Sequence, residues 1–268
     1  MRLLFIGDIV GRPGVRLVQQ LLPGLRTERG LDLVIANAEN ASNGSGCLPR
    51  DYRRLREAGV DLVTLGDHIY KKADIIPTLE ADDRVCKPAN FPPAAPGREF
   101  ARTTLPDGTT VAVFCLIGRT FMRAVDDPFQ AADRVLASLA GMAQVVIVDL
   151  HAEATADKYL LAHYLKGRVA AALGTHTHVP TADEQILDGT AFICDVGMTG
   201  PYASILGRRV DRVLQAAVTA IPTPFDVATD DVRLGGAVVD IDVSTGRATR
   251  IERVMISGPP TASQSDGE

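Results

Sequence analysis

The sequence contains no tryptophan and has only four cysteines among its 268 residues. Cys47, Cys86, Cys115 and Cys194 are far apart and form no Cys-x-x-Cys pair. Because zinc knuckles and disulfide frameworks need closely or regularly spaced cysteines, this distribution argues against both. We therefore expect the four cysteines to be buried free thiols.

Basic residues are not in excess. The 28 lysines and arginines are outnumbered by 33 aspartates and glutamates, which gives a formal net charge of −5. This balance argues against broad electrostatic capture of nucleic acid or of an anionic membrane, so we expect neither as a stable partner. A local basic or metal-charged cleft can still attract a phosphate group.

Long hydrophobic runs are also missing. No segment approaches the roughly 20 apolar residues that are needed to cross a bilayer. The apolar stretch that begins at Leu3 is interrupted by Asp8, which is too early for the apolar region of a signal peptide. We expect a cytoplasmic protein.

The residues that are present have the composition of a folded protein. Apolar residues make up 46% and charged residues 23% of the chain, which argues against disorder, collagen-like sequence and coiled coil. At roughly 150 residues per domain, the length suits one large domain or two small ones. Because no repeat or long linker divides the sequence, we expect a single domain at 1–257 and a disordered, small and polar tail at 258–268.

Short β-branched runs alternate with segments of helical period, a pattern typical of β-α units around sheets that are covered on both faces. The pattern predicts an α/β sandwich with two packed sheet regions, in which a middle hairpin makes part of the sheet antiparallel. Strands are predicted at 3–6, 33–36, 60–65, 145–150 and 169–173, helices at 15–29, 51–58, 128–143, 156–166 and 211–220, and hairpins within 99–117, 185–194 and 234–254.

Polar side chains directly follow five of these predicted strands. In open α/β sheets, binding crevices lie at the carboxyl ends of the strands, so we expect these side chains to converge. Any one of them alone is weak support for a site, but the combination is much less expected by chance. The residues are Asp8, Glu39, Asn40, Asp67, His68, His151, His176 and His178.

Carboxylate, amide and imidazole ligands without thiolates suit manganese, iron or zinc, and this many donors can hold two ions. Two ions held about 3.5–4 Å apart by a bridging carboxylate activate water and clamp phosphoryl oxygens, which indicates phosphate-ester hydrolysis. His176 and His178 can serve different ions if they lie in a loop. The alternative for this pair is a polar turn capped by Thr175 and Thr177.

Several motifs together resemble the YmdB-like branch of the calcineurin-type metallophosphoesterases, from Met1 to about Val254. They are Gly7-Asp8-Ile9-Val10-Gly11, Asn37-Ala38-Glu39-Asn40, Gly66-Asp67-His68, Asp149-Leu150-His151-Ala152-Glu153-Ala154-Thr155, Gly174-Thr175-His176-Thr177-His178-Val179-Pro180-Thr181-Ala182-Asp183 and Asp195-Val196-Gly197-Met198-Thr199-Gly200-Pro201.

The resemblance implies a calcineurin-like α/β sandwich of two packed mixed sheets flanked by helices. It also implies a bacterial cytoplasmic phosphodiesterase that acts on small cyclic nucleotides, of the 2′,3′-cyclic nucleotide 2′-phosphodiesterase type. The cofactors would be two transition-metal ions, most often iron or manganese, with zinc or magnesium as alternatives. A homodimer or homotetramer would be the usual assembly.

Carried over by position, the resemblance assigns roles to individual residues. Metal-bound hydroxide would attack phosphorus, and His68 would be the general acid that protonates the leaving alkoxide. Glu39 would bridge the ions. The first ion would be held by Asp8, Glu39 and His178, with Asn40 beside it, and the second by Asp67, His151 and His176.

Two departures from the family pattern affect the site. Relatives usually carry asparagine where this chain has Asp67, and the extra carboxylate should bind a hard cation more tightly while weakening phosphate attraction. Relatives also tend to carry Asn-Leu-Gln-Gly-Arg where this chain has Cys115-Leu116-Ile117-Gly118-Arg119, so only Arg119 of the polar residues remains as a phosphate partner. Thr199 is a second candidate for contact with the substrate, and the alternative is that Met198-Thr199-Gly200-Pro201 merely closes a loop.

The leading hypothesis is therefore a dinuclear phosphodiesterase. A non-enzymatic alternative is that Asp67 has converted the site into a nucleotide-binding sensor or a metal-stabilised regulatory protein. Amidohydrolases also use a His-x-His pair, but they normally place it after the first strand of a barrel, whereas His176 and His178 come after the middle of this chain.

Overall fold

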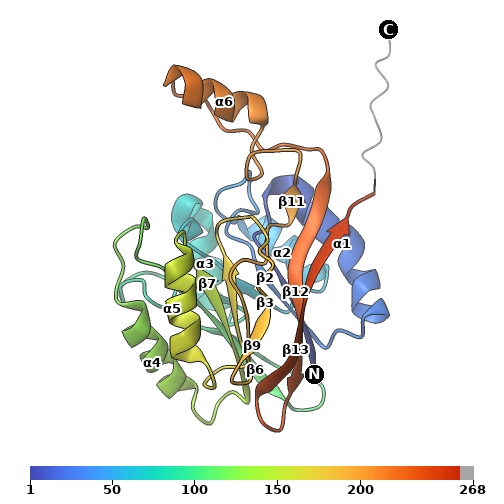
Figure 1. Cartoon of the computed structure of the whole chain (residues 1–268), viewed down its shortest axis with the longest axis vertical. Coiled ribbons are helices and arrows are strands. Elements are labelled where there is room, and N and C mark those ends of the chain that lie inside the picture. Colours follow the sequence, from blue (N-terminus) through green and yellow to red (C-terminus); the bar gives the residue numbers. More distant parts are fainter. Residues whose placement is uncertain (260–268) are drawn as a thin grey trace.

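The computed structural model describes residues 1–259, in which strands alternate with helices along part of the chain and follow one another directly elsewhere, as over residues 85–117 and 171–201 (Figure 1). The strands are β1 (Arg2–Ile6), β2 (Leu33–Asn37), β3 (Leu62–Thr64), β4 (Val85–Cys86), β5 (Ala101–Thr104), β6 (Thr110–Ile117), β7 (Val145–His151), β8 (Ala171–Thr175), β9 (Gln185–Leu187), β10 (Thr190–Ile193), β11 (Gly200–Pro201), β12 (Val232–Asp242) and β13 (Arg247–Ser257). The α-helices are α1 (Gly11–Glu28), α2 (Pro49–Glu57), α3 (Ile76–Ala81), α4 (Pro128–Leu139), α5 (Thr155–Leu165) and α6 (Val210–Thr219), and short 3-10 turns lie at Ile69–Lys71 and Ala73–Ile75.

The strands form two mixed sheets. The first has the order β11-β12-β1-β2-β3-β4, with β13 paired to β12, and the second has the order β5-β6-β7-β8-β10-β9. Each sheet has four parallel strands, β1 to β4 in the first and β6, β7, β8 and β10 in the second, flanked by antiparallel strands. The predicted fold class and the antiparallel middle hairpin are both confirmed.

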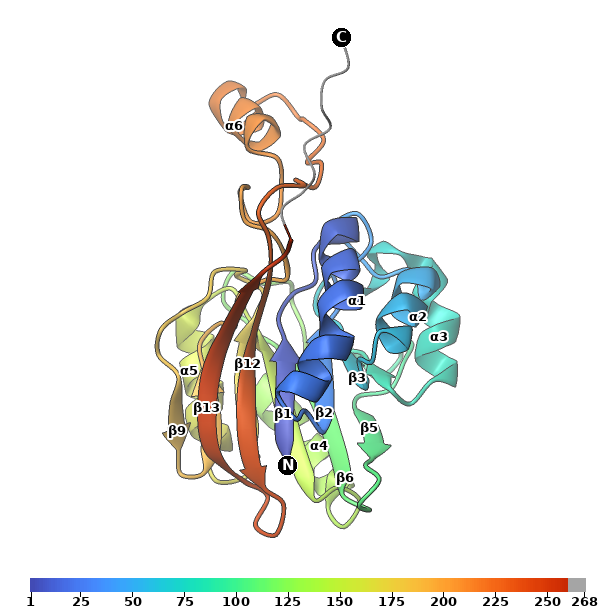
Figure 2. The same cartoon turned by 90° about the vertical axis from the view of Figure 1, so that its right-hand side faces the viewer.

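Four layers result, because both faces of each sheet are apolar. In β1, Leu3 and Phe5 point into the core between the two sheets, whereas Leu4 and Ile6 point toward α1. A third core packs α4 and α5 against the outer face of the second sheet. Figure 2 shows α1, α2 and α3 on one side of the sandwich and α5 on the other. This double burial explains why the parallel strands read as continuous apolar runs.

The predicted elements differ from the observed ones mainly at their ends. The first helix begins at Gly11 and not near residue 15, and the helix expected at 128–143 ends at Leu139. The short β4, β11 and α3 were not predicted, because two-residue strands and a six-residue helix carry no periodic pattern of their own. They are defined by pairing with distant partners, such as β11 with β12.

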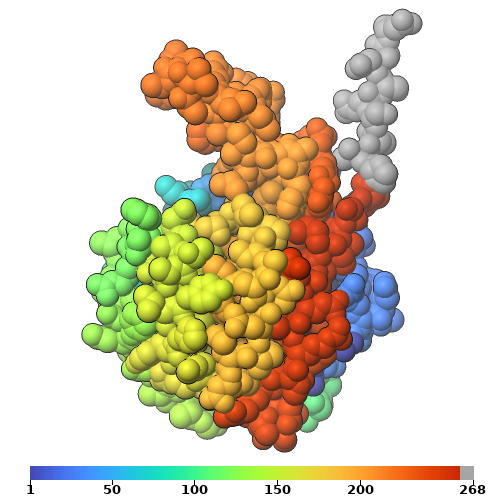
Figure 3. All heavy atoms as spheres, viewed as in Figure 1, coloured from blue at the N-terminus to red at the C-terminus, as the bar shows by residue number. Residues whose placement is uncertain are grey.

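One helix stands apart from the sandwich. The chain between β11 and β12 carries α6 away from the body, as Figures 1 and 3 show. None of the ten described residues of α6 is buried. Val210, Leu214 and Val218, spaced four residues apart along the helix, are 42%, 51% and 82% exposed. The amphipathic pattern thus predicted the helix but could not show that its apolar face would lack a partner.

The cysteines are all buried and unpaired, as expected. Burial raises the pKa of Cys47 to about 12 and that of Cys115 well above its ordinary value, so both thiols stay protonated. Within residues 1–259, no helix has the length and apolar character to span a membrane. Gly258 donates its N–H to the Val232 carbonyl at 2.8 Å, and the rest of the tail expected to be disordered, residues 260–268, lies outside the described residues.

Candidate metal centre

Carboxylates and imidazoles from both sheets meet at one edge of the sandwich. Each lies at or just beyond the carboxyl end of a parallel strand, where the chain leaves the sheet and a side chain is free to turn inward. Asp8 follows β1, Glu39 and Asn40 follow β2, Asp67 and His68 follow β3, His151 ends β7, and His176 and His178 follow β8.

Four of these residues form a tight cluster. Glu39, Asp67, His151 and His176 each offer one ligand atom, and all four atoms lie within 4.8 Å of one another. His151 is fully buried, and its Nε2 lies 3.3 Å from Glu39 Oε1, 3.2 Å from Asp67 Oδ1 and 3.1 Å from His176 Nδ1. This is a compact set of oxygen and nitrogen donors.

Asp8, Asn40 and His178 form a second group of donors. Asp8 Oδ1 is 3.8 Å from His178 Nε2, and Asn40 Nδ2 is 3.2 Å from the same nitrogen. Asn40 Nδ2 also donates to Glu39 Oε1 at 3.0 Å, which joins the two groups. His178 Nδ1 faces the Leu206 carbonyl at 3.1 Å. Since a carbonyl only accepts, Nδ1 carries the proton and Nε2 presents its lone pair.

The charges in the cluster shift the pKa values of several groups. Burial raises the pKa of Asp8 to about 6, against the opposing charges of His178 and His151. Burial acts most strongly and raises the pKa of Glu39, but the charge and hydrogen bond of His151 and the charge of His68 together outweigh it, so the pKa is lowered. Burial and the charge of His151 lower the pKa of His176 to about 4. Burial acts to lower the pKa of His151, but the charges of Glu39 and Asp8 and the hydrogen bonds to Asp67 and Glu39 raise it well above its ordinary value. Without metal, the cluster therefore holds a protonated His151 between carboxylates and beside the His176 imidazole, which resists protonation.

These residues fit bound metal ions. Asp8 Oδ1 is buried and has no hydrogen-bond partner among residues 1–259, so a fully buried carboxylate oxygen is left for a cation. His151 Nε2 and His176 Nδ1 point at each other at 3.1 Å. Without metal, a proton on His151 lies between the two nitrogens, and bound cations would replace that proton and accept both lone pairs. Nitrogen and oxygen donors without thiolates suit manganese, iron or zinc.

Polar residues inside the strands orient His151. Thr175 Oγ1 donates to Asp149 Oδ1 at 2.6 Å and lies 2.8 Å from His151 Nδ1. Because its proton goes to Asp149, the hydroxyl accepts from Nδ1–H and leaves Nε2 of the neutral ring as a lone-pair donor. Asp149 also accepts from Asn37 and Thr64, at 2.9 and 2.6 Å.

Sequence reasoning assigned no role to Asp149, Asn37 or Thr64. A signal was present, because each is a polar residue within an otherwise apolar buried strand, which is unfavourable unless its hydrogen bonds are satisfied. Glu153 was also missed. Its carboxylate lies 3.1 Å from His176 Nε2 and is half exposed.

Backbone conformation sets the two loop histidines apart from one another. His176 and His178 have φ angles of 86° and 63°, in the left-handed region that non-glycine residues rarely adopt. Each such residue costs roughly 1–2 kcal/mol. The left-handed turns direct His176 toward His151 and His178 toward Asp8, which agrees with the expectation that the pair diverges in a loop.

Two predicted substrate contacts are not brought into the cluster. The Thr199 hydroxyl is fully buried and exchanges hydrogen bonds with the backbone of Gly235, at 3.1 and 3.2 Å. Arg119 is exposed, and its guanidinium donates to Asp127 at 3.1 Å. Thr199 therefore pairs β12 with the loop after β10, and Arg119 borders α4 in the described structure.

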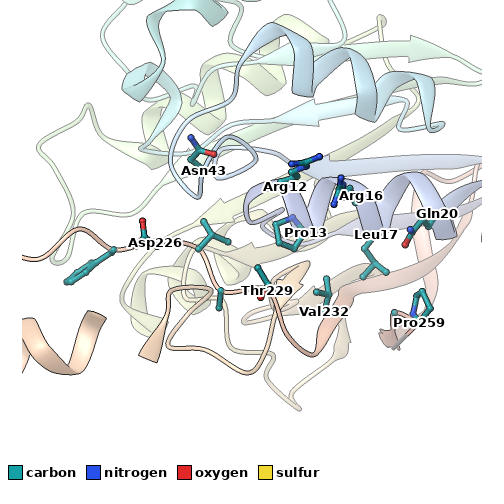
Figure 4. Close-up of a pocket in the computed structure, with 14 residues that line it drawn as sticks. Arg12, Pro13, Arg16, Leu17, Gln20, Asn43, Asp226, Thr229, Val232 and Pro259 are labelled. Atoms are coloured by element: carbon teal, nitrogen blue, oxygen red, sulfur yellow. The ribbon is translucent and has the colours of Figure 1, made fainter. Parts of the chain in front are cut away.

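A cavity of about 880 Å³ lies elsewhere, between the start of α1 and the segment that follows α6 (Figure 4). Arg12, Arg16 and Asn43 line it together with Phe225 and Asp226. It shares no lining residue with the cluster, so the candidate site is defined by its donors and not by the volume of this cavity.

The glycine before Asp67 leaves room for the cluster. A Cβ atom at Gly66 would overlap the ring of His151 and the carboxylate of Glu39. Only glycine fits this close approach between the end of β3 and the donors.

Comparisons with known proteins agree with this geometry. The sequence profile of the family described as YmdB-like protein matches residues 4–254. The 2′,3′-cyclic-nucleotide 2′-phosphodiesterase of Bacillus subtilis (strain 168) is 42% identical over 258 residues, which cover 96% of this chain and 97% of that protein.

Two solved structures have the same fold. A hypothetical protein from Thermus thermophilus superimposes with a TM-score of 0.90 at 44% identity, covering 97% of this chain and 100% of that one. A phosphatase from Mycoplasma pneumoniae superimposes with a TM-score of 0.89 at 28% identity, covering 96% and 93%.

Gly66→Ala should disrupt the cluster without unfolding the sandwich. We expect the dissociation constant for Mn²⁺, measured by calorimetry on metal-free protein, to rise at least ~10-fold because the new methyl group displaces His151 and Glu39. Gly24→Ala in α1 is the matched control, since the added carbon meets no heavy atom within 4 Å among the described residues other than its chain neighbours and the backbone of its own helix. It should keep the affinity and raise the free energy of unfolding by roughly 0.5–1 kcal/mol. An unchanged affinity in Gly66→Ala would contradict the geometry.

Proposed function

Because the chain belongs to the YmdB-like family, we propose that it is a metal-dependent hydrolase of phosphodiesters, with small 2′,3′-cyclic nucleotides as substrates. The observation that carries the proposal is the convergence of seven donors, three of them imidazoles, at one edge of the two sheets. The Bacillus subtilis relative, named for its action on 2′,3′-cyclic nucleotides, supports the substrate class.

Two ions would be held, on either side of Glu39. Asp8 and His178, with Asn40 beside them, would hold one ion, and Asp67, His151 and His176 would hold the other, with Glu39 as the bridge. Iron or manganese would be the usual metal, with zinc or magnesium as alternatives. When bound, the ions supply positive charge that activates water and neutralises the phosphoryl oxygens.

His68 would supply the proton for the leaving oxygen. Its Nδ1 lies 2.8 Å from Asn40 Oδ1, and its backbone N–H donates to Glu39 Oε2 at 3.0 Å. Since the Asn40 oxygen only accepts, Nδ1 carries a proton permanently and Nε2 is the atom that gains and releases one. The His68 side chain is 32% exposed, so Nε2 can exchange its proton with solvent.

Substitution of His68 tests this role. His68→Ala should lower kcat for 2′,3′-cyclic AMP and bis-p-nitrophenyl phosphate by roughly 10²- to 10⁴-fold, the usual contribution of a general acid. The measurement is hydrolysis by the Mn²⁺-loaded enzyme. His163→Ala is the matched control because His163 is an exposed residue of α5 outside the donor cluster. Full activity in His68→Ala would refute the role, and no hydrolysis by the parent enzyme with any metal would refute the proposed function.

A nucleotide sensor is the second candidate, and Asp67 is the observation that favours it. Burial acts to raise the pKa of Asp67, but the hydrogen bond and charge of His151 hold it below its ordinary range. The carboxylate is therefore ionised and adds a negative charge where a phosphate would bind. Binding of cyclic nucleotide without turnover would favour the sensor.

Asp67→Asn separates two effects of the Asp67 charge, which are repulsion of phosphate and binding of the metal ion. Loss of one negative charge should lower the inhibition constant of inorganic phosphate by roughly 5-fold and raise kcat/KM, because two unit charges about 4 Å apart in water repel by about 1 kcal/mol. The Mn²⁺ dissociation constant should rise, since an amide oxygen is a weaker ligand. An unchanged Mn²⁺ affinity would show that the Asp67 carboxylate is not a ligand.

We also propose that the chain forms a homodimer or homotetramer. A ten-residue helix is marginal in water without packing, and α6 has an apolar face that the rest of its own described chain leaves exposed. Leu214→Glu should lower the mass measured by light scattering to that of a monomer, whereas Gln215→Glu, an exposed polar position, should not change it. A monomeric parent protein would refute the proposal.

The remaining proposals concern cellular location and domain organisation. We propose a cytoplasmic protein, because four unpaired buried thiols suit a reducing compartment. We propose that residues 1–257 act as one domain, since both sheets contribute to the core that lies between them.

A further inference from the structure

Two charged residues that the proposed mechanism does not use lie buried beneath the histidine loop. Lys158 on α5 and Asp195 after β10 have side chains that are 0% and 1% exposed, and Lys158 Nζ donates to Asp195 Oδ2 at 2.8 Å. Removing such charges from water is unfavourable, and replacing the pair with apolar residues is often neutral or stabilising. Stability alone therefore does not explain the pair.

The pair holds Thr177, the residue between the two loop histidines. The Thr177 hydroxyl donates to Asp195 Oδ2 at 2.5 Å and accepts from Lys158 Nζ at 3.0 Å. The Thr177 backbone N–H donates to the same carboxylate oxygen at 3.2 Å. Asp195 Oδ1 accepts from the Gly197 N–H at 2.7 Å, so the carboxylate itself is fixed.

The loop needs such an anchor because His176 and His178 both have left-handed backbone conformations. Among the hydrogen bonds of residues 1–259, the backbone of His176 makes one other that positions it. Its N–H donates to Asp8 Oδ2 at 3.0 Å. Gly174 contributes room, since a Cβ there would overlap the Cys194 carbonyl and approach Lys158 Cδ at 3.1 Å. Gly174 and Asp195 thus both help to hold the loop that carries His176 and His178 in its left-handed conformation.

We propose that Lys158 and Asp195 are positioning residues for the metal centre: through Thr177 they hold the loop so that His176 and His178 face different ions. This role rests on the proposed function, because it presupposes that the two histidines bind metal. The positioning role also explains why the motif that begins at Asp195 carries a buried carboxylate that the proposed mechanism does not otherwise use.

Thr177→Val and Thr177→Ser test the anchor in a matched way, since only serine keeps the hydroxyl. We expect the Mn²⁺ dissociation constant of Thr177→Val to rise roughly 10-fold, and that of Lys158→Met by up to roughly 100-fold, in the range found when groups that orient metal ligands are removed. Thr177→Ser should stay close to the parent value. The measurement is calorimetry on metal-free protein, with circular dichroism and the Tm of the metal-free form to confirm folding.

Arg168→Met is the control for loss of an ion pair near α5, because Arg168 pairs with Asp133 on the surface at 2.6 Å. It should leave Mn²⁺ affinity unchanged. A folded Thr177→Val protein with the parent affinity, or equal losses in Thr177→Val and Thr177→Ser, would overturn the positioning role while leaving the proposed function intact. If Lys158→Met does not fold, the threonine pair alone decides. A parent protein that binds no Mn²⁺ would overturn the metal centre and this role with it.

Discussion

The buried carboxylate of Glu39 is the constraint on which the arrangement of the site depends. One of its oxygens accepts from the His68 N–H, and the other lies within 3.3 Å of both Asn40 Nδ2 and His151 Nε2. Asp8 and Asp67 are the other two carboxylates among the donors. Three carboxylates with little access to water repel one another, so the folded state needs positive charge between them. Without metal, a protonated His151 supplies part of that charge, whereas the proposed ions would supply it themselves and bind the imidazoles as neutral ligands.

The fold supports this concentration of charge with hydrogen bonds that reach out from the site. Thr175 and Asp149 determine that Nδ1 of His151 carries a proton, and the Leu206 carbonyl does the same for Nδ1 of His178. The Lys158–Asp195 pair lies beneath the loop that carries His176. Thr175, Asp149, Lys158 and Asp195 are buried, whereas Leu206 is an exposed residue. The hydrogen bonds among the buried groups offset part of the free-energy cost of removing them from water.

The amino-acid sequence predicted a large part of this site because most of its residues directly follow strands. Strand period and the position of the next polar residue are local features, and they were enough to select Asp8, Glu39, Asp67 and His151. The partner of Thr199 could not be found from local sequence. Its place in a motif suggested substrate contact, but its hydroxyl bonds to Gly235, 36 residues later, on a strand whose position in the sheet no local pattern reveals.

The same division holds for the whole molecule. The sequence by itself determined the kind of fold, the chemical type of the donors, their order along the chain and the shortage of basic surface, because periodicity, composition and motif spacing are properties of neighbouring residues. Tertiary structure alone decided which donors share one space, which hydroxyl orients His151, which lysine lies under the histidine loop and that α6 stands away from the body. Those features depend on two sheets stacking face to face, which brings residues more than 100 positions apart within hydrogen-bond distance, such as Asn37 and Asp149.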